Sequence, residues 1–201
     1  MNFLPLSRTT LSNPYNEMIV IMAGLPATGK STLARAVASE LNGIVVDKDS
    51  VRAALFSSCV DYTPEQDDLS MECVYSAVRY MAHAHGDVPV FIDGRPFARK
   101  VHLERALEVI QETGALWRII ETTCSDEVAR ARLEAAASHL AANRTFDLYC
   151  ALKARLEPIS DPKLIVNTER PIEHCVQQCV DYLASVRAAP DGTPHRQSDR
   201  A

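Results

Sequence analysis

The sequence predicts an α/β protein built on one parallel β-sheet with helices on both faces. Short apolar runs alternate along the chain with longer segments that are apolar on one side only, which is the pattern of strands joined by helical crossovers. The apolar runs show no polar alternation, as strands covered on both faces require. A stretch with the spacing GxxxxGK[ST] lies between the first apolar run and the first amphipathic segment, where a phosphate-binding loop belongs.

Five apolar runs are the predicted strands, at residues 18–23, 44–46, 88–92, 116–120 and 164–166. The helices predicted between and after them are marked by residues that begin or end helices. They are a segment that includes Leu33 and stops at Asn42-Gly43, a segment from Thr63-Pro64 to Gly86, residues 101–113 before Gly114, a segment from Ser125 through His139, a segment from Thr145 to Glu157-Pro158, and residues 171–186.

A chain of 201 residues fits one domain, which we place at residues 18–187. Residues 1–17 include Pro5 and Pro14 and show no periodicity, so an irregular N-terminal extension is expected. Residues 188–201 contain no apolar residue larger than alanine apart from proline, and a disordered tail is expected there.

Composition excludes several classes of protein. A net charge of −5 gives no broad positive field that would gather a nucleic acid or an anionic membrane surface. The longest apolar run, Met18 to Ala23, is far shorter than the roughly 20 residues of a membrane-spanning helix. The six cysteines form no CxxC pair and follow no secretory segment, so reduced, buried thiols in a cytoplasmic protein are expected. The sequence does not indicate an oligomeric state.

The stretch AGLPATGKST carries the strongest functional signal. A glycine-rich turn between a buried strand and a helix points backbone N–H groups into a concavity, and the helix N-terminus adds partial positive charge. Lys30 would bind the β and γ phosphates of a nucleoside triphosphate, and the hydroxyl of Ser31 would ligate magnesium. The alternative is a chance match inside a structural loop, which the flanking strand and helix disfavour. The predicted phosphate-binding residues are Gly24, Ala27, Thr28, Gly29, Lys30, Ser31 and Thr32.

Acidic and basic residues follow the second strand in VVDKDSVR, at the carboxyl edge where ligands collect in open parallel sheets. Asp49 lies one helical turn before Arg52, so both side chains can face one cleft. Asp49 would take the proton of an attacking hydroxyl, and Arg52 would orient the acceptor. The alternatives are a helix cap for Asp49 and a solvated turn carboxylate for Asp47, and we favour the latter for Asp47.

A second acidic position follows the third strand in VFIDGRPF. Asp93 would orient the magnesium shell or the acceptor beside the phosphate loop. The alternative is a turn residue of an Asp-Gly pair. Arg95 lies near the same edge and would either pair with a substrate anion or cover the surface.

Residues from about 130 to 146 are expected to form a lid over the nucleotide, with Arg144 at its far hinge. Arg130 and Arg132 are two residues apart on the helix after Ser125 and therefore lie on different faces. Because Arg130 has Glu134 as an i, i+4 partner, we assign to Arg132 the neutralisation of charge on the transferring phosphoryl group. Which of the two arginines has this role stays open.

Two other groups of residues favour structural roles. His83 and His85 diverge on a helix, and no third ligand has matching spacing, so a favourable interaction with the helix dipole is expected. Cys175 and Cys179 fall on the apolar side of the last helix, so we expect burial rather than metal binding with His174.

From Ile19 to Leu183 the chain resembles the P-loop kinase-like ATP-binding proteins, an AAA-type family of kinases related to phage polynucleotide kinase, chloramphenicol phosphotransferase and zeta toxins. The resemblance is carried by GLPATGKSTLA, DKDSVR, FIDGRPFAR, CSDEVARARL and LKARLEPI. It implies a three-layer P-loop fold with the strand order 2-3-1-4-5 and the use of ATP with Mg²⁺. It implies no single acceptor.

In the polynucleotide kinase branch of this family, D-x-x-R after the second strand supplies the general base and an acceptor-binding arginine, which Asp49 and Arg52 match. Asp93 matches an active-site aspartate, and Arg132 matches a lid arginine that contacts the phosphates. Gly94-Arg95 stands where that branch has Thr-Asn, so the resemblance implies a different acceptor pocket.

The sequence therefore predicts a kinase that transfers the γ-phosphate of ATP to a hydroxyl of a small molecule. A polynucleotide 5′-hydroxyl kinase is one alternative, which the acidic balance and the lack of a basic stripe disfavour. A nucleotide-dependent switch that phosphorylates nothing is another, and Asp49 and Arg52 count against it. The sequence does not identify the acceptor.

Overall fold

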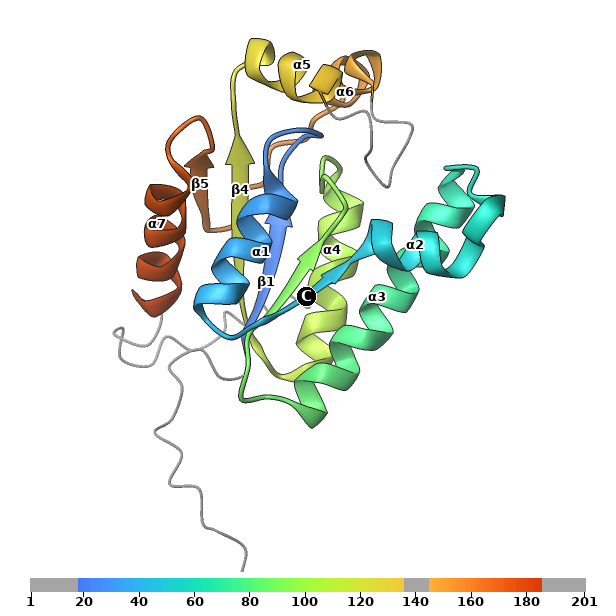
Figure 1. Cartoon of the computed structure of the whole chain (residues 1–201). Helices are drawn as coiled ribbons and strands as arrows, with labels where there is room; N and C mark the ends of the chain where they lie inside the picture. Colours follow the sequence, from blue (N-terminus) through green and yellow to red (C-terminus); the bar gives the residue numbers. More distant parts are fainter. Residues whose placement is uncertain (1–17, 136–144, 186–201) are drawn as a thin grey trace, which may run out of the picture.

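The computed structural model describes residues 18–135 and 145–185. The expected N-terminal extension, the expected tail and the central part of the expected lid, with Arg144, lie outside these residues. In three layers, helices cover both faces of a central parallel sheet (Figure 1). The buried apolar residues form one large cluster on each face of this sheet, and Leu25, Ala129 and Tyr149 form a smaller third cluster.

The sheet has five parallel strands in the order β2-β3-β1-β4-β5, which confirms the predicted fold. The strands are β1 (Met18–Ala23), β2 (Ile44–Asp47), β3 (Val90–Asp93), β4 (Leu116–Thr123) and β5 (Lys163–Asn167). All residues of the central strand β1 are buried, so its continuous apolar run reflects cover on both faces.

Two strand boundaries differ from the prediction by more than one residue. β3 begins at Val90 rather than at residue 88, because Pro89 has no N–H for the ladder; its carbonyl instead accepts from the amide of Ile44 at 2.9 Å. β4 continues to Thr123, because its last residues still pair with β5, Thr122 with Val166 and Thr123 with Asn167.

The helices are α1 (Lys30–Glu40), α2 (Lys48–Phe56), α3 (Pro64–Ala84), α4 (Lys100–Thr113), α5 (Asp126–Ala135), α6 (Phe146–Lys153) and α7 (Ile172–Ala184), with a 3-10 turn at Ser57–Cys59. α1 and α7 pack on one face of the sheet, and α3 and α4 pack on the other. The predicted caps are present: Thr63 accepts from the amide of Gln66 at 3.3 Å, Thr145 accepts from the amide of Leu148 at 3.2 Å, and Gly114 has a left-handed φ of 71°.

Two helix predictions were wrong. The sequence reading missed α2, which follows β2 with almost no connection. It also extended α6 to Glu157, whereas α6 ends at Lys153. Beyond that point the backbone amide of Glu157 donates to the carbonyl of Ala98 at 2.9 Å, so the chain leaves the helix to pair with the loop before α4.

The cysteines are free thiols, but they are not all buried as predicted. Cys175 and Cys179 are buried between α7 and the sheet, as their place on the apolar side of α7 indicates. Cys59 and Cys150 are exposed, because they lie in the short turn after α2 and on the outer side of α6. No helix among the described residues is long and apolar enough to cross a membrane.

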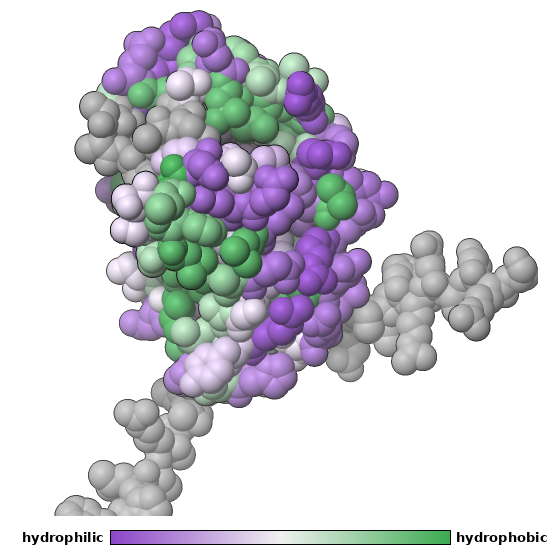
Figure 2. All heavy atoms as spheres, turned by 90° about the vertical axis from the view of Figure 1, so that its right-hand side faces the viewer, coloured by the Kyte–Doolittle hydropathy of each residue, from purple (hydrophilic) through white to green (hydrophobic). Residues whose placement is uncertain are grey.

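The side of the molecule that carries α2 and the beginning of α3 is mixed in character (Figure 2). Hydrophilic residues occupy much of this side, and hydrophobic residues form a band beside them. Among the exposed hydrophobic residues of these two helices are Leu55 and Leu69.

Candidate functional site

The loop between β1 and α1 requires glycine at its two ends. Gly24 has a φ of 127°, and a Cβ there would lie 2.4 Å from the carbonyl oxygen of Thr122. Gly29 caps α1 with a φ of 87°, and a Cβ would crowd the side chain of Thr168. The loop therefore packs its backbone tightly against the ends of β4 and β5, and α1 begins directly at Lys30.

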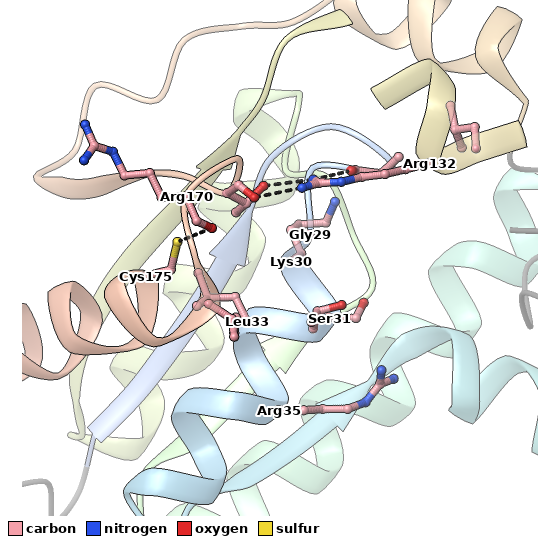
Figure 3. A pocket seen from close by; sticks show the side chains of 13 residues that line it. Gly29, Lys30, Ser31, Leu33, Arg35, Arg132, Arg170 and Cys175 are labelled. Carbon is pink, nitrogen blue, oxygen red and sulfur yellow. Dashed lines mark hydrogen bonds between the residues drawn. The ribbon is translucent and has the colours of Figure 1, made fainter. Parts of the chain in front are cut away.

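A first cavity of about 540 Å³ opens beside this loop (Figure 3). Five of the predicted phosphate-binding residues line it, namely Ala27, Gly29, Lys30, Ser31 and Thr32. Gly24 and Thr28 do not: Gly24 packs against β4, and the hydroxyl of Thr28 bonds the carbonyl of Leu25 at 2.8 Å and the hydroxyl of Thr122 at 2.7 Å. These two residues shape the loop from behind.

Lys30 is buried, and its ammonium donates to the carbonyl of Leu25 at 2.7 Å. The amine thus lies at the inner side of the loop, at the N-terminus of α1, where backbone N–H groups and the helix dipole favour an anion.

Arg132 reaches from α5 across the first cavity to the loop after β5 (Figure 3). Its guanidinium donates to the carbonyl of Ala27 at 3.1 Å, to the hydroxyl of Thr168 at 2.9 Å and to the carbonyl of Thr168 at 2.8 Å. Arg130 points elsewhere and lies over the ring of Phe146 at 3.7 Å. Of the two arginines, Arg132 is the one that faces the first cavity.

Sequence reasoning missed Thr168. Its hydroxyl donates to the carbonyl of Thr28 at 2.8 Å while it accepts from Arg132, so it joins α5 to the phosphate loop. The available signal was its position directly after the fifth apolar run, at the same carboxyl edge of the sheet as Asp49 and Asp93.

A second cavity of about 460 Å³ lies on the other side of Lys30. The charged residues that line it are Lys30, Lys48, Asp49, Arg52, Asp67, Asp68, Arg95 and Arg99. The structure thus brings Asp49, Arg52 and Arg95 together, as predicted. Among the described residues, Lys30 alone lines both cavities.

The structure corrects the expectation for Asp47 and leaves Asp49 facing the cleft. Asp47 is not a solvated turn carboxylate; it caps α2 by accepting from the amide of Asp49 at 2.9 Å, and its side chain is only 12% exposed. Asp49 lies in the first turn of α2, is buried, and accepts from Arg52 at 3.2 Å. Since Asp47 caps the helix, the carboxylate of Asp49 is left to line the second cavity.

Asp67, in the first turn of α3, joins the cations of the second cavity and was not predicted. It accepts from Lys48 Nζ at 2.5 Å, from Arg52 Nη2, and from Arg95 Nε at 3.1 Å. Burial alone would raise the pKa of Asp67, but Lys48 and Arg95 outweigh it, so the pKa lies below its usual value. The sequence signal was weak, because acidic residues in the first turn of a helix are commonly explained by the dipole.

Asp93 ends β3 beside the phosphate loop and is fully buried. Neither of its carboxylate oxygens has a hydrogen-bond partner among the described residues. A bare buried carboxylate is costly, and carboxylate and hydroxyl oxygens are the ligands that Mg²⁺ prefers. Asp93 together with Ser31 therefore fits a magnesium ion, which proteins usually bind through one or two side chains plus water and phosphate oxygens.

The histidines and cysteines singled out in the sequence lie away from both cavities, apart from Cys175, which lines the first. His83 bonds the carbonyl of Arg79 at 2.7 Å within α3. In residues 18–135 and 145–185, no three His, Cys, Asp or Glu side chains are grouped so as to hold a metal ion by themselves.

Comparison with solved structures finds the same fold in several kinases. A gluconokinase from Sinorhizobium meliloti matches with a TM-score of 0.60 and 15% identity over 85% of this chain and 93% of the other. The Mycobacterium tuberculosis APS kinase CysC, in complex with AMPPNP and APS, matches with a TM-score of 0.63 and 16% identity over 84% and 98%. The protein APE1195 matches with a TM-score of 0.64 and 24% identity over 86% and 97%.

No curated protein matches the chain. The family AAA_33, described as "AAA domain", matches residues 19–158, which include the phosphate loop, Asp49, Asp93 and Arg132. The chain belongs to this family and has the fold of P-loop kinases.

Proposed function

We propose that this member of the AAA_33 family is a phosphotransferase that moves the γ-phosphoryl group of ATP to a hydroxyl of a small-molecule acceptor. The observation that carries the proposal is that two cavities meet at Lys30. One has the loop and helix N-terminus that suit phosphates, and the other has a buried carboxylate that suits a hydroxyl. A phosphoryl group bound at Lys30 lies between its donor and its acceptor.

The first cavity is proposed to hold the nucleotide. The backbone N–H groups from Ala27 to Thr32 would bind the phosphates, and Lys30 would exchange the carbonyl of Leu25 for phosphate oxygens. Arg132 would cover the nucleotide from the α5 side, because its guanidinium already spans the cavity from α5 to Thr168. That three of its hydrogen bonds go to protein oxygens favours a positioning role for Arg132 over direct neutralisation of the transferring phosphoryl group.

Ser31 and Asp93 are proposed to hold Mg²⁺, Ser31 as a direct ligand and Asp93 directly or through water. When bound, the ion supplies positive charge to the phosphate oxygens. Asp93 is preorganised for this task, since its position at the end of a buried strand fixes the carboxylate without engaging its oxygens.

Asp49 is proposed to receive the proton. The acceptor oxygen forms a bond to the γ-phosphorus while the bond from that phosphorus to the β–γ bridging oxygen breaks, ADP leaves, and the hydroxyl proton passes to Asp49. Arg52 holds the Asp49 carboxylate at 3.2 Å, so it fixes the orientation of the base.

The solved structures with the same fold include a gluconokinase, an APS kinase and a sugar kinase, which agrees with this class of reaction. The alternatives are a polynucleotide 5′-hydroxyl kinase and a nucleotide switch without an acceptor. The net charge of −5 and the carboxylates of the second cavity do not favour a polyanionic acceptor.

The experiment is a screen of ADP release with Mg·ATP across a panel of hydroxyl compounds and oligonucleotides with free 5′ ends, followed by Asp49→Asn. We expect turnover stimulated by a small molecule and a loss in kcat on the order of 10²–10⁴-fold in the variant. Asp181→Asn, on the exposed side of α7, is the control and should retain full activity. Stimulation by oligonucleotide ends alone, or ATP binding without any acceptor-stimulated turnover, would contradict the proposal.

A further inference from the structure

We infer that the acceptor of the proposed reaction is an uncharged compound rich in hydroxyl groups, because the second cavity pairs its buried cations with carboxylates of the protein itself. This inference rests on the proposed function, in which the second cavity holds the acceptor. The inference names the chemical class of the acceptor, which the phosphate loop alone does not determine.

Three buried cations of the second cavity share one carboxylate. The side chains of Lys48, Arg52 and Arg95 are each no more than 7% exposed, and all three donate to Asp67. Arg95 donates to it through both Nε and Nη2. An ionised carboxylate offers about four lone-pair sites, so Asp67 is saturated with donors and the cations are fixed around it.

Two further carboxylates complete the pairing. Asp49 accepts from Arg52 at 3.2 Å and lies 3.8 Å from Lys48, and Asp68 accepts from Arg95 at 2.7 Å. Each of these three buried cations therefore has a carboxylate partner. An anionic acceptor would have to displace one of these carboxylates or lie beside it, and like charges at such distances repel strongly in a partly buried site.

The other positive groups that line the second cavity do not change the balance between buried cations and carboxylates. Lys30 belongs to the phosphates in the proposed function, and Arg99 is exposed to water, which screens its charge. The imidazole of His102 has a pKa below its usual value, through burial first and then through Arg95 and Arg99, so it adds no charge near neutral pH.

One fully buried side-chain donor of a residue that lines the second cavity lacks a hydrogen-bond partner among the described residues. Arg52 Nε is buried and has no hydrogen-bond partner among the described residues, while the guanidinium of Arg52 is held over the ring of Tyr62 at 5.3 Å. A hydroxyl or ether oxygen satisfies one N–H without adding charge. The same compound can donate its hydroxyl protons to the carboxylates around it.

Part of the wall suits a carbon skeleton. Apolar side chains from four separate segments line it, namely Pro26, Pro64, Pro96, Ala98, Leu148 and Leu152. A cavity lined by both paired charges and apolar residues fits a compound with both hydroxyl groups and C–H surface, as compact polyols and sugars have.

The first test compares acceptors that share a carbon skeleton and differ in one carboxylate, such as glycerol with glycerate and glucose with gluconate. With Mg·ATP, kcat/KM for the neutral member of a stimulating pair should exceed that of the anionic member by about tenfold or more. A preference for anionic members would overturn the inference and leave the proposed kinase function intact. If no pair is stimulated, the second test decides the inference by binding alone.

The second test uses inorganic sulfate as the probe, with Mg·AMPPNP filling the first cavity. The ¹⁵N NMR signals of Arg52 Nε and Arg95 Nε should not respond to sulfate in the wild-type protein. They should respond in Asp67→Asn, which removes the internal anion, and more weakly in Asp68→Asn, whose carboxylate is exposed enough for the variant to fold if Asp67→Asn does not. Asp181→Asn should behave as wild type.

Each outcome of the sulfate titration decides the inference. Sulfate binding at Arg52 or Arg95 of the wild-type protein would overturn it, whether or not the protein is a kinase. Absence of binding in wild type and in every folded variant would also overturn it, because the internal carboxylates would then not be what excludes an anion.

Discussion

The two cavities that meet at Lys30 are built in different ways. Seven of the thirteen residues that line the first belong to the phosphate loop and α1, and the other six come from α5, the loop after β5 and α7. The second is made of side chains from α2, α3, α6 and the loop after β3. A backbone cradle binds phosphate through geometry that a short motif encodes, whereas a side-chain cavity depends on which distant segments the fold brings together. A sequence motif therefore identifies a site of the first kind but does not identify a site of the second kind.

The largest effect is expected at Lys30, which lines both cavities. Lys30→Met should lower kcat on the order of 10³-fold, because it removes the cation at the point where charge develops on the transferring group. Steady-state kinetics would check this. The matched control is Lys100→Met, since Lys100 is exposed at the start of α4 and lines neither cavity. Near-normal kcat in Lys30→Met would contradict the shared role.

The first cavity should be the more sensitive to backbone change. Gly24→Ala should destabilise the protein by about 2–4 kcal/mol, because the added Cβ meets the carbonyl of Thr122 at a positive φ. Urea denaturation measures this free energy of unfolding. Gly114→Ala is the control: it also has a positive φ but no atom within 4 Å of the added Cβ, and it should cost about 1 kcal/mol. Equal losses would show that crowding at the loop is unimportant.

The second cavity should be the more sensitive to pH. The pKa of folded Asp67 lies below its usual value of 3.8, so its ionised form stabilises the fold above that pH. This contribution is lost as the pH falls through the lowered folded value. Asp67→Asn should therefore be less stable than wild type by about 2 kcal/mol near pH 7, with a difference that shrinks in acid below pH 3.8.

Urea denaturation of wild type and Asp67→Asn from pH 7 downward is the measurement. A stability difference that stays constant through the acid range would show that the ionised carboxylate is not responsible. Nucleotide affinity should be the same in both proteins at neutral pH, since Asp67 lines only the second cavity.

The smallest expected effect concerns Thr168, at the edge of the first cavity. Thr168→Val removes the hydroxyl that links Arg132 to the carbonyl of Thr28 and should weaken ATP binding by about 1 kcal/mol, or roughly fivefold. Calorimetric titration with AMPPNP would measure this, with Thr113→Val at the distant end of α4 as the control. A change in the KM of the acceptor instead would contradict its place on the nucleotide side.

The fold and the first cavity were largely predictable from the sequence. The five apolar runs and the capping residues Thr63, Thr145 and Gly114 act locally, so the elements they mark appear where expected. The missed helix α2 is the exception. Asp47 is both the last residue of β2 and the cap of α2, so no loop sequence separates the strand from the helix and marks where the helix begins.

The second cavity was only partly predictable. Asp49 and Arg52 follow β2 at the carboxyl edge of the sheet, a position that periodicity reveals. Asp67 does not: it lies 15 residues from Arg52 and 28 from Arg95 along the chain, and only the packing of α3 against α2 and β3 brings them together. Which cation pairs with which carboxylate depends on that packing, and no local sequence pattern predicts these pairs.

The contact of Lys30 with the carbonyl of Leu25 has a consequence for selectivity among anions. One N–H of the ammonium is occupied before any ligand arrives, so an anion that reached only this group would have to displace that hydrogen bond or use another of the three N–H donors. A ligand that also engages the N–H groups of the loop and the start of α1 makes several contacts at once. Under the proposed function, a triphosphate chain that spans these groups is therefore expected to bind better than a single phosphate ion.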